Sequence, residues 1–242
     1  MAKKGAKKGT KKGTKKGTKK NAKKSAKKRV AILISGRGSN MVALIKAAKS
    51  KTYPAQIVLV ISNEPAAEGL KHARKAGIPT AIVDHRPHGK NRESFERVLD
   101  AELERHKIEL VCLAGFMRLL TPWFVGRRNG RLLNIHPALL PSFKGLDTHA
   151  RALAAGVKIH GATVHFVVPE MDSGPIIAQA ALAIAENDTP SSLAARVIKL
   201  EHRIYSLALK LVAQGRVRIA NGRCIVGKSA PVKSALIVPN DR

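Results

Sequence analysis

An amide, an imidazole and a carboxylate stand near apolar segments in the second half of the chain. Asn134 and His136 end an apolar run, and Asp172 opens an Asp-Ser-Gly-Pro turn 36 residues after His136. An Asn amide can hold a carbonyl oxygen, a His can move a proton near neutral pH, and an Asp can fix the imidazole tautomer and favour its charged form. Brought together, these three groups could carry out an acyl transfer.

Each of these residues also has a purely structural explanation. Asn134 could cap a strand end, His136 could be a half-buried histidine with satisfied hydrogen bonds, and Asp172 could be the turn residue before Gly174. The spacing alone leaves both explanations open, because a shared site requires that the fold bring the residues together.

A glycine-rich loop follows the first apolar run. Gly36 and Gly38 precede a helical pattern, but Met41 occupies the position of the third glycine in a dinucleotide-binding loop. Gly38, Ser39 and Asn40 still offer close backbone approach, polar side chains and the free N–H groups of a helix start, which attract phosphate. The loop therefore fits a monophosphate better than a dinucleotide, and a simple chain reversal remains the alternative.

A third loop, residues 114–120, follows another apolar run. Because the carboxyl ends of parallel strands bind ligands, we expect it to line an apolar slot, in which Met117, Leu119 and Leu120 could pack against a flat ring. Arg118 would need an anion or a hydrogen-bonded partner if it were buried. Residues 137–141 are rigid and apolar, as expected of a pocket wall.

Composition limits the classes of protein to consider. The 242 residues suffice for one large domain with tails, and two cysteines are too few for a secreted disulfide framework. The sequence has neither an apolar stretch of membrane-spanning length nor an apolar segment after its N-terminal charges. We therefore expect a cytoplasmic protein without membrane contact.

The formal charge of +29 is concentrated at the N-terminus. Residues 1–28 hold 14 Lys and no acidic residue, and removing these charges leaves +15 for the rest of the chain. The Lys pair repeats every four residues without apolar surface, so we predict a disordered tail. We favour a nonspecific contact with nucleic acid or another polyanion over a purely solubilising role.

Apolar and helical segments alternate in the body, which predicts an α/β fold with a mostly parallel sheet flanked by helices. Extended runs at residues 160–168 and 175–184 suggest a mixed sheet edge, and Thr189-Pro190 can start a helix toward residue 212. The expected strands are residues 30–34, 56–61, 80–84, 109–114 and 131–135, and the expected helices are residues 66–76 and 91–106. Residues 216–242 contain two short strand candidates, and we expect a loosely attached extension.

Five segments in order resemble those of the formyltetrahydrofolate-dependent transferases. They are Gly36-Arg-Gly-Ser-Asn40, Ala114-Gly-Phe-Met-Arg-Leu-Leu120, Asn134-Ile-His-Pro-Ala-Leu-Leu-Pro141, His160-Gly-Ala-Thr-Val-His165 and Asp172-Ser-Gly-Pro175. The resemblance covers residues 29–215, and five ordered motifs are far more specific than any one of them. It implies a Rossmann-like formyltransferase fold.

The resemblance also implies roles for individual residues. The reaction would move a formyl group from 10-formyltetrahydrofolate to the amine of glycinamide ribonucleotide, without a metal, in de novo purine synthesis. The implied catalytic residues are Asn134, His136 and Asp172; the implied substrate-binding residues are Gly38, Ser39, Asn40 and Glu201; and the implied folate-binding residues are Arg92, Met117, Arg118, Leu119, Leu120 and Asn134.

Two residues depart from the family pattern. Lys144 replaces a proline that is common in this loop, and Asp147 stands where a His is expected, which affects the fine geometry of the pocket.

Three alternative functions also remain. A formyltetrahydrofolate hydrolase should carry an extra N-terminal domain, a methionyl-tRNA formyltransferase should carry a larger C-terminal domain, and a nucleic-acid-associated protein with an inactive body would not need the three polar residues.

Overall fold

The computed structural model describes residues 1–2, 5, 26–227, 236 and 238. Most of the predicted lysine-rich tail, and the end of the predicted C-terminal extension, lie outside the described residues. In the part of the chain that is described, no helix is long and apolar enough to cross a membrane.

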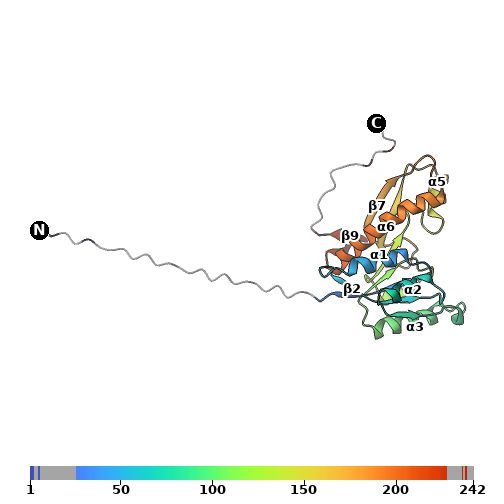
Figure 1. Cartoon of the computed structure of the whole chain (residues 1–242), viewed down its shortest axis with the longest axis horizontal. Helices are drawn as coiled ribbons and strands as arrows, with labels where there is room; N and C mark the ends of the chain where they lie inside the picture. Colours follow the sequence, from blue (N-terminus) through green and yellow to red (C-terminus); the bar gives the residue numbers. More distant parts are fainter. Residues whose placement is uncertain (3–4, 6–25, 228–235, 237, 239–242) are drawn as a thin grey trace.

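One seven-stranded sheet forms the centre of the body, flanked by helices (Figure 1). Its strand order is β3-β2-β1-β4-β5-β6-β7. The first five strands are parallel, whereas β6 and β7 are each antiparallel to the preceding strand, so the predicted mostly parallel sheet with a mixed edge is confirmed. The strands are β1 (Lys28–Ile34), β2 (Ala55–Ser62), β3 (Thr80–Ile82), β4 (Leu110–Leu113), β5 (Leu132–His136), β6 (Ile159–Phe166) and β7 (Ile176–Ala183).

Strand β1 is buried on both faces, as its continuous apolar sequence predicts. Alternate side chains point to opposite faces of a strand, so Val30, Ile32 and Ile34 join one core cluster while Ala31 and Leu33 join the other. All five are inaccessible to solvent. The strand therefore contributes side chains to both core clusters, one on each face of the sheet.

The helices divide between the two faces of the sheet. Helices α1 (Ser39–Ala48), α2 (Glu68–Lys75) and α6 (Pro190–Ala213) contribute to one core cluster, and α1 and α6 pack side by side (Figure 1). Helices α3 (Arg92–Arg105) and α4 (Pro122–Arg127) contribute to the other cluster. A short 3-10 helix, η1 (Arg86–His88), precedes α3.

Helix α6 begins at the predicted Thr-Pro signal and fixes the strands that carry the site. Thr189 and Ser192 exchange hydrogen bonds in a capping box, with Pro190 in the first turn. The Tyr205 hydroxyl lies 2.9 Å from the Leu113 carbonyl and 3.0 Å from the Leu133 carbonyl. The helix is thereby tied to β4 and β5 directly before Asn134.

Some elements differ from the sequence prediction. Helices α4 and α5 (Thr148–Ala154) were not predicted, and both are short. The two short strands expected after residue 216 form the hairpin of β8 (Val217–Ala220) and β9 (Arg223–Val226). Val217 and Cys224 pack against the core on the α6 face, so this hairpin is attached to the body.

Candidate active site

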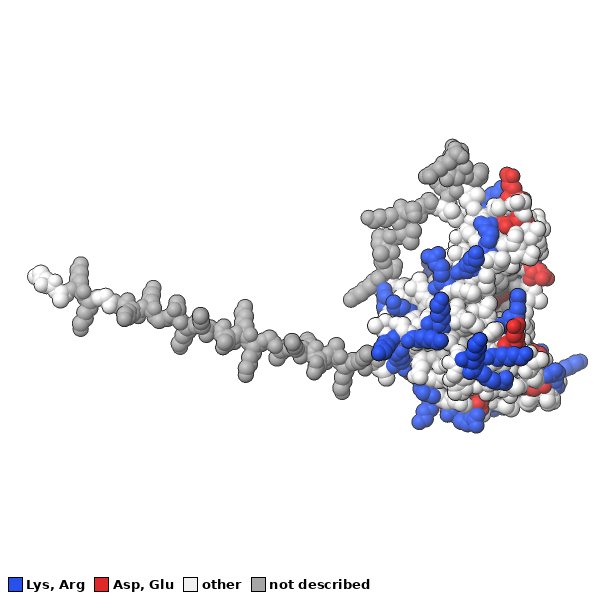
Figure 2. Space-filling view, in the orientation of Figure 1, with Lys and Arg blue, Asp and Glu red and all other residues white. Residues whose placement is uncertain are grey.

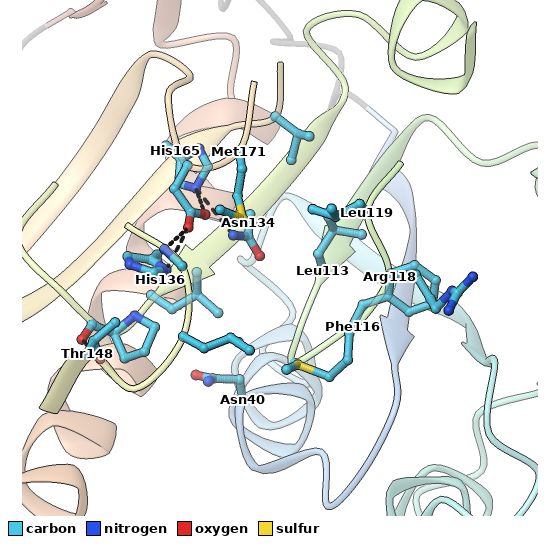
Figure 3. A pocket seen from close by; sticks show the side chains of 18 of the residues that line it. Asn40, Leu113, Phe116, Arg118, Leu119, Asn134, His136, Thr148, His165 and Met171 are labelled. Atoms are coloured by element: carbon cyan, nitrogen blue, oxygen red, sulfur yellow. Dashed lines mark hydrogen bonds and ion pairs between the residues drawn. The ribbon is translucent and has the colours of Figure 1, made fainter. Parts of the chain in front are cut away.

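A cavity of about 930 Å³ opens at the carboxyl ends of β1, β4 and β5. Ligands of open α/β sheets bind at this edge, because the loops that follow parallel strands meet there. Asn134 and His136 lie at the end of β5, two residues apart, and so share a face of the strand. Figure 3 shows both of them with His165 on one side of the cavity, while Arg118 points to the other side.

His136 is buried and has an acceptor at each ring nitrogen. Its Nδ1 lies 3.3 Å from Asp172 Oδ2, and its Nε2 lies 2.9 Å from the Phe143 carbonyl oxygen. The Asp172 carboxylate also accepts a hydrogen bond of 2.9 Å from the Gly145 N–H. The Nε2 atom thus faces the Phe143 carbonyl, and the Nδ1 atom faces the Asp172 carboxylate at the cavity. The structure thus brings His136 and Asp172 together as the catalytic hypothesis requires.

Asn134 is oriented by His165, a residue that the sequence analysis quoted in a motif but did not assign to the site. The two residues are register partners on β5 and β6, and Asn134 Nδ2 lies 3.2 Å from His165 Nε2. His165 Nδ1 lies 2.8 Å from the Phe166 carbonyl oxygen, and burial lowers the pKa of His165. A neutral His165 with its proton on Nδ1 therefore accepts a hydrogen bond from the Asn134 amide. One amide hydrogen and Oδ1 of Asn134 remain for a ligand.

The start of α1 and the middle of α6 also contribute to the lining of the cavity. Asn40 Nδ2 donates a hydrogen bond of 2.6 Å to Glu201 Oε2, and both residues line the cavity. Asn40 is 7% exposed, and its Oδ1 has no hydrogen-bond partner among the described residues. Burial raises the pKa of Glu201, against the effect of the hydrogen bond from Asn40. This buried pair therefore presents polar atoms toward a ligand.

The loop after β4 forms the apolar side of the cavity. Met117, Arg118, Leu119 and Leu120 all line it, together with Leu113 at the end of β4. Met117 and Leu119 are 63% and 59% exposed. Large apolar side chains that stay exposed beside a cavity are typical of a ligand-binding surface. The Met117 N–H donates to Ser35 Oγ at 2.8 Å, which fixes this loop to the end of β1.

Three of the predicted site residues do not line the cavity in the described structure. Gly38 and Ser39 lie between the lining residues Arg37 and Asn40, at the N-terminus of α1. Arg92 is exposed at the first position of α3. The other predicted site residues, Asn40, Met117, Arg118, Leu119, Leu120, Asn134, His136, Asp172 and Glu201, are all among the lining residues.

Comparisons with known proteins point to one family. The family model described as Formyl transferase matches residues 28–209. The chain is 42% identical over 203 residues to phosphoribosylglycinamide formyltransferase of Escherichia coli, with 84% of this chain and 95% of the relative covered. It is 40% identical to a crystal structure of glycinamide ribonucleotide transformylase 1 from Symbiobacterium toebii, with a TM-score of 0.80 and 83% and 94% of the two chains covered.

A longer relative also matches. The chain is 50% identical over 196 residues to the human trifunctional purine biosynthetic protein adenosine-3, with 81% of this chain but only 19% of that protein covered. The chain thus spans about a fifth of the length of the trifunctional relatives it matches.

Proposed function

The chain belongs to the formyl transferase family, and on this basis we propose that it transfers a formyl group from 10-formyltetrahydrofolate to the amine of glycinamide ribonucleotide, in de novo purine synthesis. One observation carries the proposal. Asn134, His136 and Asp172 line the same cavity as the buried pair of Asn40 and Glu201. Two substrates can therefore meet between the polar groups.

The apolar side of the cavity fits the folate donor. A flat, mostly apolar ring needs contacts with aliphatic side chains and thioethers, which Leu113 and the residues from Met117 to Leu120 supply. Asn134 would complete this subsite at the reacting end. We keep Arg92 as a proposed folate contact from outside the cavity, since it is exposed on α3. When bound, the donor supplies the formyl group.

The start of α1 fits the phosphate end of glycinamide ribonucleotide. The helix has no side-chain cap, so the N–H groups near Gly38, Ser39 and Asn40 are available to an anion. Arg37 lines the cavity beside them and adds a positive charge. Glu201 is proposed to contact the sugar or amide region, with the Asn40 side chain as its neighbour.

The polar residues then divide the chemistry between them. As the amine attacks the formyl carbon, Asn134 donates its remaining amide hydrogen to the carbonyl oxygen, which gains negative charge. His136 in its charged form places a positive charge beside that oxygen, while its Nδ1–H is directed to Asp172 Oδ2, which stabilises the charged form. The attacking amine then gives up a proton, a proton passes to the folate nitrogen, directly or through water, and the bond between the formyl carbon and that nitrogen breaks, which releases tetrahydrofolate and the formylated amine.

An acceptor comparison tests this proposal. Purified protein is mixed with 10-formyltetrahydrofolate and either glycinamide ribonucleotide, charged tRNA or water alone, and formyl transfer is followed for each. We expect turnover only with glycinamide ribonucleotide. Turnover in water alone would identify a hydrolase, preference for charged tRNA would identify a different transferase, and no turnover with any acceptor would favour an inactive body.

We also propose a function for the lysine-rich segment outside the catalytic body. Residues 1–28 hold 14 Lys and no acidic residue, and Lys and Arg also gather on the face of the body seen in Figure 2. Such charge supports a salt-sensitive, nonspecific contact with nucleic acid or another polyanion.

We further propose that residues 29–215 form the catalytic domain and that residues 216–242 form an extension. We also propose that the protein is located in the cytoplasm.

A further inference from the structure

Two loops meet beside His136 and are joined by two hydrogen bonds. Residues 137–147 follow β5, and residues 167–175 connect β6 to β7. Lys144 Nζ donates to Ser173 Oγ at 2.6 Å, and the Gly145 N–H donates to Asp172 Oδ2 at 2.9 Å. Lys144 is one of the two residues that depart from the family pattern, and the proposed reaction gives it no role.

Each loop holds one side of the His136 ring. The first loop supplies the Phe143 carbonyl, which lies 2.9 Å from Nε2, and the second supplies the Asp172 carboxylate, which lies 3.3 Å from Nδ1. Lys144 directly follows Phe143, and Ser173 directly follows Asp172. The bond between Lys144 and Ser173 therefore fixes the distance between the two groups that orient the imidazole.

The backbone of these loops needs such a constraint. Phe143, Asp147 and Asp172 have φ values of 56°, 55° and 50°. A residue with a side chain in this left-handed region costs on the order of 1 kcal/mol or more and persists only when its surroundings hold it there. Arg151 of α5 also holds the first loop, because its Nη1 lies 2.5 Å from the Lys144 carbonyl oxygen and 3.2 Å from that of Leu146. The Lys144 side chain, together with the Gly145 N–H, reaches across to the second loop.

We propose that Lys144 is a positioning residue for the reaction: through Ser173 it locks the two loops so that the Phe143 carbonyl and the Asp172 carboxylate hold His136 with Nδ1 toward the cavity. The inference rests on the proposed formyl transfer. Because the bond is charge-assisted but exposed, its loss should have a moderate effect rather than abolish activity.

A double-mutant cycle tests this role. We expect Lys144→Met and Ser173→Ala each to lower kcat about 3- to 10-fold, with KM for both substrates within about 2-fold of the unmodified protein. The double variant should lose no more than the worse single variant, because both changes remove the same contact. Lys144→Arg should recover most of the lost kcat. Lys210→Met, on an exposed residue near the end of α6, is the matched control and should behave like the unmodified protein.

Three results would overturn the proposal. They are an unchanged kcat in both single variants, losses that multiply in the double variant, and an equal loss in Lys210→Met. Equal melting temperatures of all variants and the control would show that the losses do not come from unfolding.

A ligand-free measurement separates this inference from the proposed reaction. The ¹⁵N signals of the His136 ring report the hydrogen bond at Nε2 without any substrate. We expect Lys144→Met to weaken that bond, seen as a changed Nε2 shift and faster exchange of its proton, while Lys210→Met leaves both unchanged. An unaltered Nε2 signal in Lys144→Met would refute the positioning role even if the protein proved inactive toward glycinamide ribonucleotide, a result that would refute only the proposed reaction.

Discussion

His136 can satisfy both of its neighbours in only one protonation state. The Phe143 carbonyl and the Asp172 carboxylate are both acceptors, and a neutral imidazole carries a single N–H. Only the imidazolium, with two N–H groups, can donate to both acceptors, and this is the form that the proposed mechanism uses. Its positive charge at the cavity would favour a developing oxyanion. His165 has the opposite arrangement, since its pKa is lowered by burial and its Nε2 accepts from Asn134.

Removing either member of the His136 and Asp172 pair should reduce turnover strongly. We predict that His136→Ala or Asp172→Asn lowers kcat by at least about 100-fold, the usual range for losing an acid-base group. Steady-state kinetics with saturating substrates measure the effect. His72→Ala is a suitable control, because His72 lies on α2 outside the cavity. Near-normal turnover of both pair variants, with the same melting temperature as the control, would contradict the mechanism.

The sequence predicted the types of the polar residues better than their partners. Asn134 and His136 could be placed at a strand end from the apolar run before them, but the spacing gave no contact with Asp172, which depends on how β5 and β6 pair. His165 alternates with apolar residues on β6, a pattern equally typical of a core histidine. The Phe143 carbonyl could not be predicted at all, because a backbone atom carries no residue-type signal.

Gly38 shows why a residue type can have more than one cause. From the sequence, a glycine at this position could serve either close backbone approach to a phosphate or a simple chain reversal. In the structure its φ is 74°, and a Cβ there would come within 3.1 Å of Gly69 Cα and of Met41 Cε. A side chain at position 38 would thus strain the loop even without a ligand, and a Gly38→Val variant cannot test phosphate binding by itself.

At the scale of elements, buried strands and long helices were predictable and short helices were not. The expected strands and the helices α2, α3 and α6 match the observed ones within a few residues, because apolar periodicity and caps mark them. Helix α4 begins with Thr121-Pro122, the same signal that predicted α6, but six residues give no measurable periodicity. Helix α5 follows Asp147, a common N-cap residue whose side chain makes no cap hydrogen bond here, and its seven residues are likewise too few to show a periodicity.

A buried histidine on β6, His160, lies beside His149 of α5 and should make folding stability depend on pH. His160 is 1% exposed, and its Nε2 lies 3.2 Å from His149 Nδ1. Burial, followed by the charge on His149, lowers the pKa of His160 from 6.5 to about 4. Between these values the unfolded chain binds more protons, so stability increases with pH and decreases as pH falls. Burial also lowers the pKa of His149 and His165, in the same direction, whereas it raises that of Glu201, which acts in the opposite sense.

We predict that His160 makes the protein less stable at pH 4.5 than at pH 7 by about 2–3 kcal/mol, the linkage value for such a pKa difference. Urea unfolding of the unmodified protein and of His160→Gln at both pH values measures its share. The variant should show a smaller difference between the two pH values, whatever its absolute stability. An unchanged difference would mean that His160 titrates alike in the folded and unfolded states.

In the whole molecule, the lysine-rich segment is directly connected to the folded body, because its last two lysines contact residues of the body. Lys28 is the first residue of β1 and pairs with Glu109 at 2.7 Å, and Lys27 Nζ donates to the Ser50 carbonyl at 2.9 Å. The last lysines of the repeat therefore belong to the body. A deletion meant to remove the repeat without damaging β1 should end at residue 25, which still removes 12 of its 14 Lys.

Deleting residues 1–25 should leave formyl transfer within about 2-fold of the full chain and weaken nucleic-acid binding. Lysines that neutralise phosphates release counterions, and each neutralised phosphate steepens the dependence of log affinity on log salt by about 0.7–0.9. The truncated protein should therefore show a flatter salt dependence, while its remaining charge of +17, which is 29 minus the 12 Lys removed, retains weak binding. A full-length variant with those 12 Lys replaced by Gln separates charge from length, and should match the truncation in a salt series of affinity for a fixed RNA or DNA. Equal slopes of log affinity against log salt for the full chain and both variants would show that the segment acts only as a solubility tail. A loss of transferase activity in either variant would show that the segment belongs to the catalytic body.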